Sequence, residues 1–217
     1  MGRHHVFVTG GTGYLGRPLI DLLIRRGHTV RALVRAQSVS RLPAGAEAIV
    51  GNALDSADWR SRVAPADTFV HLVGTPHPSP AKAAEFRSVD LPSIRASVDA
   101  ASTAGVRHFV YVSVAHPAPI MQAYIGVRQE GEGMIRATGI PATVLRPWYV
   151  LGPGHWWAYA LVPFYAIARL LPSTRAGAER LALVTYEAML AALVRAVENP
   201  PGSVRIVEPA EIRRSRL

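Results

Sequence analysis

The chain has 217 residues, of which 49% are hydrophobic and 18% are charged, and it contains no cysteine. This composition predicts a globular protein and excludes disulfides, thiolate metal ligands and a cysteine nucleophile. The formal net charge is +9 at pH 7. Because the arginines that produce it are scattered and no recognition module is visible, we expect no nucleic-acid partner.

A chain of this length accommodates one α/β domain, so we expect a single domain over residues 1–217. The first strand begins almost at once and no signal peptide precedes it, which leads us to expect a cytoplasmic protein. No pair of histidines or carboxylates has metal-ligand spacing on one element, so we expect no metal. The oligomeric state is not encoded in any pattern we find.

Strands and helices alternate along the chain, which predicts a doubly wound, mostly parallel sheet of the Rossmann type. In chain order we expect strands at 6–9, 29–34, 47–50, 68–73, 108–112, 142–146 and 204–207. Helices are expected at 15–26, at 81–104 with a kink at Pro92, at 125–138 and at 185–197. A proline-rich loop fills 75–80.

A glycine-rich turn joins the first strand to the first helix, with glycine at three positions spaced three apart. Gly10 permits the tight turn, Gly13 lets a diphosphate approach the backbone, and Gly16 lets the helix pack on the sheet. The amides that open the helix then face the diphosphate. The turn predicts a dinucleotide site that also includes Thr12, Tyr14 and Leu15.

The end of the second strand indicates which dinucleotide is bound. A carboxylate about 20 residues beyond the glycine turn would bind the ribose hydroxyls of NAD. Arg35 stands there instead, and a guanidinium can clamp a 2′-phosphate. We therefore predict NADP(H) as the cofactor, with NAD as the alternative. If Arg35 binds no ligand, it is simply a solvent-exposed residue at the end of the strand.

Further motifs extend along nearly the whole chain: Leu33-Val34-Arg35, the run from Gly105 to Ser113, Leu145-Arg146-Pro147, and Leu151-Gly152-Pro153-Gly154. With the glycine turn, they resemble the short-chain dehydrogenase/reductase superfamily. The resemblance is to its atypical and extended branches, which include NmrA-like sensors and complex I accessory-subunit-like proteins. It implies a cofactor lying across the carboxyl ends of the strands, with contacts from Asn52, Ala53, Leu72, Val73, Gly74, Pro147 and Val150.

In this superfamily a tyrosine and a lysine four residues later carry the chemistry. Here the matching positions hold Tyr124 and Arg128. The resemblance implies that Tyr124 donates the proton, Arg128 clamps the nicotinamide ribose and activates the tyrosine, and Ser113 binds the substrate oxygen. Arginine is not interchangeable with lysine, and Ser113 is followed by Val114-Ala115 where relatives have a second hydroxyl residue.

Residues 148–185 follow the sixth strand, where relatives place a small substrate-side lid, and their stretch 156–171 is apolar and aromatic. This stretch is too short and interrupted for a membrane span. Four roles are compatible with this stretch: binding an apolar substrate such as a quinone or isoprenoid, forming a protein interface, contacting a membrane surface, or filling the core of the lid.

Two functions follow. The first is an NADPH-dependent oxidoreductase, or an epimerase/dehydratase-like relative, acting on a small apolar carbonyl or quinone-like compound. The second is a non-catalytic dinucleotide-binding sensor or assembly protein.

Overall fold

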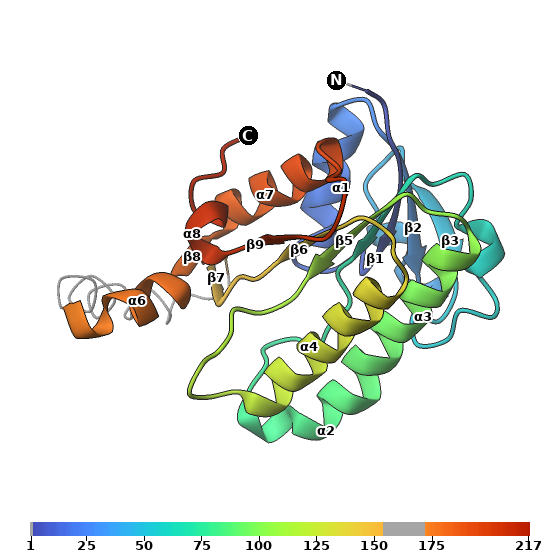
Figure 1. The fold of residues 1–217 in the computed structure, drawn as a ribbon. Helices are drawn as coiled ribbons and strands as arrows, with labels where there is room; N and C mark the ends of the chain where they lie inside the picture. Colours follow the sequence, from blue (N-terminus) through green and yellow to red (C-terminus); the bar gives the residue numbers. More distant parts are fainter. Residues whose placement is uncertain (1, 154–171) are drawn as a thin grey trace.

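The computed structural model describes residues 2–153 and 172–217 (Figure 1). Its strands are β1 (His5–Thr9), β2 (Thr29–Val34), β3 (Glu47–Val50), β4 (Thr68–His71), β5 (His108–Val112), β6 (Ala142–Leu145), β7 (Tyr149–Leu151), β8 (Leu183–Thr185) and β9 (Arg205–Val207). Its α-helices are α1 (Gly16–Arg25), α2 (Ala83–Glu85), α3 (Leu91–Thr103), α4 (Gln122–Ala137), α6 (Pro172–Arg180), α7 (Tyr186–Glu198) and α8 (Pro209–Ile212).

Seven strands form one parallel sheet in the order β3-β2-β1-β4-β5-β6-β9. The chain builds outward from β1 in one direction and then restarts at β4 in the other. In open α/β sheets, ligands bind in the crevice at this reversal, beyond the carboxyl ends of the strands. The glycine turn follows β1 and therefore lies at the reversal, and the predicted Rossmann-type fold is confirmed.

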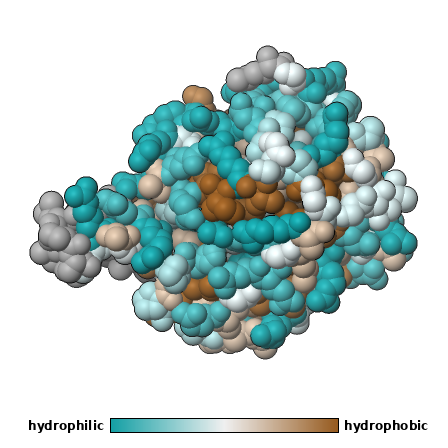
Figure 2. All heavy atoms as spheres, viewed as in Figure 1, coloured by the Kyte–Doolittle hydropathy of each residue, from teal (hydrophilic) through white to brown (hydrophobic). Residues whose placement is uncertain are grey.

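Helices cover both faces of the sheet, α1 and α7 on one side and α3 and α4 on the other (Figure 1). The face under α1 and α7 is mainly aliphatic. The face under α3 carries a row of aromatic rings, in which Phe7 stacks on Trp59 and Phe69 on Phe109. On the face seen in Figure 2, hydrophobic residues gather near the centre and mostly hydrophilic residues surround them.

The predicted strands agree closely with the observed ones, with β2, β3 and β5 matching at both ends. Strand β4 ends at His71, two residues earlier than expected. The long helix predicted over 81–104 is divided by a π-helical turn, η4 (Phe86–Asp90), which leads into α3. Pro92 explains it, because its ring lacks an N–H and would clash with the carbonyl of Ser88 in a regular helix.

Beyond β6, the short strands β7 and β8 form a separate parallel pair that the sequence patterns did not predict. Helix α6 extends away from the main sheet (Figure 1). The apolar stretch 156–171, for which we predicted a substrate or membrane role, lies outside the described residues. Within 2–153 and 172–217, no helix is both long enough and apolar enough to cross a bilayer.

Candidate dinucleotide site

The glycine turn between β1 and α1 has the geometry that its spacing predicts. Gly10 has a φ of +76°, and a Cβ there would lie 2.8 Å from the carbonyl carbon of Leu72. A Cβ on Gly16 would overlap the carbonyl oxygen of Gly10. Glycine is therefore required at both positions, because the turn packs directly on the backbone that follows β4 and on itself.

The start of α1 fits a dinucleotide. No side chain caps the helix, and its first turn carries no acidic residue. The Leu15 and Gly16 amides donate to no other described residue. Gly13 is exposed, and a Cβ built on it would meet only the Gly10 carbonyl oxygen, at 3.1 Å. Unpaired amides and a positive helix end together form a cradle for a diphosphate.

The second and third glycines should therefore respond differently to alanine. We expect Gly13→Ala to change the melting temperature little, since its methyl group would meet only one backbone atom, at 3.1 Å. It should weaken NAD(P)H binding at least tenfold, since the methyl group would narrow the diphosphate cradle. We expect Gly16→Ala to destabilise the protein by roughly 2 kcal/mol or more, because backbone must move to make room. Thermal unfolding and NADPH fluorescence titration measure the two effects, and equal melting temperatures for the two variants would contradict this assignment.

The residues predicted to hold the adenosine end lie at the carboxyl ends of β2 and β3. Arg35 follows β2 directly, is exposed, and forms no ion pair with another described residue. Asn52 is also exposed, but its Oδ1 accepts the Leu54 amide at 3.0 Å and so closes a local turn. Ala53 packs at the border of the aromatic core. Arg35 is thus available for a ligand phosphate, whereas the side-chain oxygen of Asn52 already serves the backbone.

The guanidinium of Arg128 lies buried at the ends of β4 and β5. Its Nη2 donates to Asp90 Oδ1 at 2.7 Å and its Nη1 to the Val112 carbonyl at 3.2 Å, while Nε has no partner in the described part of the chain. The other carboxylate oxygen of Asp90 accepts the Thr75 amide and hydroxyl. Burial opposes the charge of Arg128, but Tyr124, Tyr111 and Asp90 together raise its pKa.

This ion pair explains a glycine that the sequence analysis assigned to the cofactor. A Cβ on Gly74 would overlap Nη2 of Arg128 and would lie 3.2 Å from Asp90 Oδ1. Gly74 therefore makes room for the guanidinium. Asp90 itself was missed, and only its position two residues before Pro92 could have drawn attention to it.

Tyr124 occupies the first turn of α4 and lies beside this ion pair. The guanidinium carbon of Arg128 is 5.0 Å from the centre of its ring, and the ring of Phe86 is 4.9 Å away. Tyr124 is half-buried in a small apolar cluster with Val114 and Trp148. Its hydroxyl has no hydrogen bond to another described residue. Tyr124 and Arg128, predicted as partners, are thus brought into contact.

Ser113 is placed differently from the role that the family resemblance implies. It is buried, and its hydroxyl donates to Glu132 Oε1 at 2.7 Å. Glu132 also accepts both ends of the Arg146 guanidinium and one nitrogen of Arg136. Burial raises the pKa of Glu132, but these donors more than offset it and the net pKa is lowered. The Ser113 hydroxyl proton thus serves a buried carboxylate.

The remaining predicted contacts follow the strand ends. Leu72 and Val73 lead from β4 under the glycine turn, the Pro147 carbonyl accepts the Ala115 amide at 3.1 Å, and Val150 pairs with Val184 across the small sheet. Leu72 touches Gly10, so the turn, the β4 end, Arg128 and Tyr124 form one continuous row at the reversal. Among the described residues, no group of three or more histidine, aspartate or glutamate side chains has the arrangement of a metal site.

Comparisons with known proteins agree with this geometry. A family model described as NAD(P)H-binding matches residues 10–153. Ceramide reductase of Caulobacter vibrioides is 31% identical over 212 residues, which cover 96% of this chain and 65% of that protein. A 4-hydroxy-2-methyl-3-oxo-4-farnesyl-3,4-dihydroquinoline-1-oxide ketoreductase of Stigmatella aurantiaca is 30% identical over 170 residues, or 67% of this chain and 50% of that protein. The match therefore spans only half to two thirds of these relatives.

Solved structures show the same fold. The Bordetella bronchiseptica enzyme WbmH in complex with NAD+ superimposes with a TM-score of 0.71 at 21% identity, covering 95% of this chain and 76% of that one. A short-chain dehydrogenase/reductase superfamily protein from Agrobacterium tumefaciens with bound NAD gives a TM-score of 0.69 at 21% identity, covering 94% and 77%. The resemblance stated from the motifs is confirmed, and the chain belongs to the NAD(P)H-binding family of Rossmann proteins.

Proposed function

We propose that this protein is an NADPH-dependent reductase that acts on the carbonyl group of an apolar or quinone-like compound. The contact between the Tyr124 ring and the buried Arg128 guanidinium, 5.0 Å apart at the ends of β4 and β5, carries the proposal. It sets a phenol beside a fixed positive charge on the row that begins at the diphosphate cradle. The reductase and ketoreductase names of the two relatives support the reaction class.

When bound, the nicotinamide supplies a hydride to the carbonyl carbon. The Tyr124 hydroxyl then gives its proton to the carbonyl oxygen, which leaves an alcohol and a phenolate that recovers a proton from solvent. Arg128 acts as a positioning residue, because its charge faces the phenolate and cannot be lost by deprotonation. Ser113 takes no part, since its hydroxyl is committed to Glu132.

Turnover with graded substrates tests this function. NADPH oxidation would be followed with ketones of increasing chain length and with quinones of increasing side-chain length. We expect kcat/KM to rise with apolar area, because each buried methylene contributes about 0.8 kcal/mol. Saturable NADPH binding without turnover of any carbonyl or quinone would refute the reductase and leave a binding protein.

Cofactor preference depends on Arg35. We expect Arg35→Asp to weaken NADPH binding by about 10- to 100-fold and to leave NADH binding unchanged or improved, because a charge-assisted contact to the 2′-phosphate contributes about 1.5–3 kcal/mol. Arg107→Asp is the matched control, since Arg107 is also exposed but precedes β5 and so lies at the amino ends of the strands, away from the predicted site. Equal affinity of the wild type for NADH and NADPH would contradict the preference.

A dinucleotide-binding protein without catalysis is the second candidate. The observation that favours it is the commitment of Ser113 to Glu132 and of Arg128 to Asp90, which leaves Tyr124 as the single family-matched group still free to react. Substitution of Tyr124 separates the two candidates and is treated in the Discussion.

A further inference from the structure

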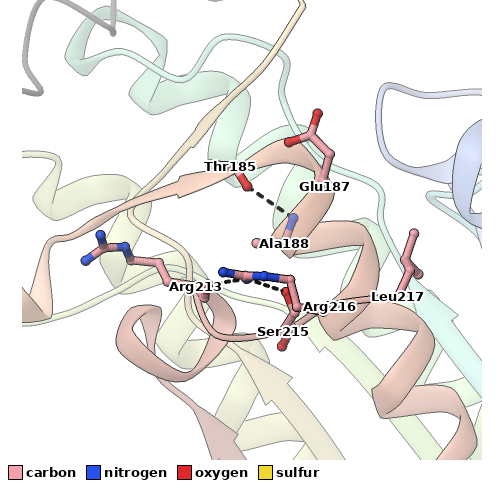
Figure 3. Close-up of a pocket in the computed structure, with 7 residues that line it drawn as sticks. All are labelled: Thr185, Glu187, Ala188, Arg213, Ser215, Arg216 and Leu217. Atoms are coloured by element: carbon pink, nitrogen blue, oxygen red, sulfur yellow. Dashed lines mark hydrogen bonds between the residues drawn. The ribbon is translucent and has the colours of Figure 1, made fainter.

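The start of helix α7 lies beside the glycine turn although 172 positions separate them in the chain. Thr185 ends β8 and caps the helix, accepting the Ala188 amide at 3.2 Å (Figure 3). A cavity of about 350 Å³ opens on the other side of this helix start, against the chain segment that ends in Arg216 and Leu217 (Figure 3). Tyr186, the first residue of α7, is absent from that cavity lining and is directed to the glycine turn.

Two contacts join Tyr186 to the turn, and a glycine makes room for them. Its hydroxyl donates to the Tyr14 carbonyl oxygen at 3.0 Å, and the two rings lie 4.8 Å apart at 53°. Gly152, just after β7, lies against both residues: a Cβ there would overlap the Tyr14 hydroxyl and would lie 2.8 Å from Tyr186 Cβ. The glycine of the Leu151-Gly152-Pro153 motif is therefore needed so that both rings fit.

The hydrogen bond from Tyr186 affects the cofactor side of the turn through the peptide group that joins Tyr14 and Leu15. The Tyr14 carbonyl and the Leu15 amide belong to the same planar trans unit, so they point in opposite directions. Holding the carbonyl toward Tyr186 therefore aims the Leu15 N–H away from it. That N–H donates to no other described residue and is one of the unpaired amides at the start of α1.

From this arrangement we propose that Tyr186 is a positioning residue for the dinucleotide. By holding the Tyr14 carbonyl, it orients the Leu15 N–H on the other side of the same peptide group toward the diphosphate. The inference rests on the proposed cofactor binding and adds a residue far from the glycine motif. Polarisation of a peptide group at its oxygen also strengthens donation from its nitrogen. Because Gly152 belongs to the substrate-side segment, the same contacts tie that segment to the cofactor cradle.

The test compares NADPH affinity with stability. Tyr186→Phe keeps the ring contact and removes the hydrogen bond, so we expect NADPH to bind about three- to tenfold more weakly, with a small change in melting temperature. The chemical shift of the Leu15 amide in the cofactor-free protein should move as well. Gly152→Ala should weaken binding similarly, and Tyr14→Phe should partly restore it, because the atom that collides most closely is the Tyr14 hydroxyl.

Ala196→Gly serves as the control, since it weakens the same helix near its other end without touching the turn. It should lower the melting temperature and leave NADPH affinity unchanged. If the wild type binds NADPH and Tyr186→Phe has the same dissociation constant and the same Leu15 amide shift, the role of Tyr186 is overturned while the proposed function stands. Failure of the wild type to bind any dinucleotide would instead overturn the proposed function.

Discussion

Replacing Tyr124 by phenylalanine should lower kcat by roughly 10²- to 10⁴-fold, which is the contribution of a positioned proton donor. The ring should keep its contacts with Phe86 and Arg128, because only the hydroxyl is lost. NADPH affinity should therefore stay within about twofold of the wild type. Steady-state rates at saturating NADPH and a separate fluorescence titration measure the two quantities.

Ser113→Ala provides the contrast to this substitution. Its hydroxyl hydrogen bond goes to buried Glu132, so removing it should cost about 1–3 kcal/mol of stability and change kcat little. Residual activity of Tyr124→Phe close to that of the wild type would remove Tyr124 from the mechanism. A large kinetic defect in Ser113→Ala with unchanged stability would restore the family role to the serine.

Breaking the buried ion pair should have the largest effect on stability. Asp90 and Arg128 have side chains that are 1% and 7% exposed, and their charged atoms are 2.7 Å apart. Asp90→Asn leaves a guanidinium that cannot lose its proton and has no counter-charge, so we expect a loss of about 3–5 kcal/mol. Arg128→Met should cost less, because Asp90 keeps its hydrogen bonds from the Thr75 amide and hydroxyl. Urea unfolding measures both losses.

An exposed pair gives the matched control for this prediction. Asp21 and Arg25 lie on α1 with their charged atoms 2.8 Å apart, close to the 2.7 Å of the buried pair, and their side chains are 48% and 64% exposed. Asp21→Asn should change the free energy of unfolding by less than about 1 kcal/mol. The double variant Asp90→Asn with Arg128→Met should be more stable than Asp90→Asn alone; if it were less stable, the uncompensated charge would not be the cause.

Local patterns in the sequence were sufficient for most of the fold. Short apolar runs that follow a glycine located β2, β3 and β5. For β2 and β5 the run reflects burial, because most residues of these two strands are buried. The glycine turn was also predictable, because all of its conformational requirements fall within seven consecutive residues, from Gly10 to Gly16. Strands β7 and β8 were not predicted, because a strand of three residues is too short for its hydrophobic pattern to distinguish it from a loop.

Partners distant in sequence were not predictable. Arg128 was expected at the ribose, but its ion pair with Asp90 spans 38 positions, and nothing near either residue specifies the other. Gly74 was expected to contact the cofactor and Gly152 was noted only as part of a family motif, whereas in the structure each one accommodates a side chain from elsewhere. Such contacts depend on how helices settle on the sheet, which spacing along one element does not encode.

The π-helical turn before α3 lies between two residues of the site, Phe86 and Asp90. It holds Phe86 against Tyr124 at one end and Asp90 against Arg128 at the other. The winding between Phe86 and Asp90 therefore sets how the aromatic wall beside the phenol is turned relative to the buried acid. A substitution that changed this one turn would move that wall, while Asp90 kept its partner.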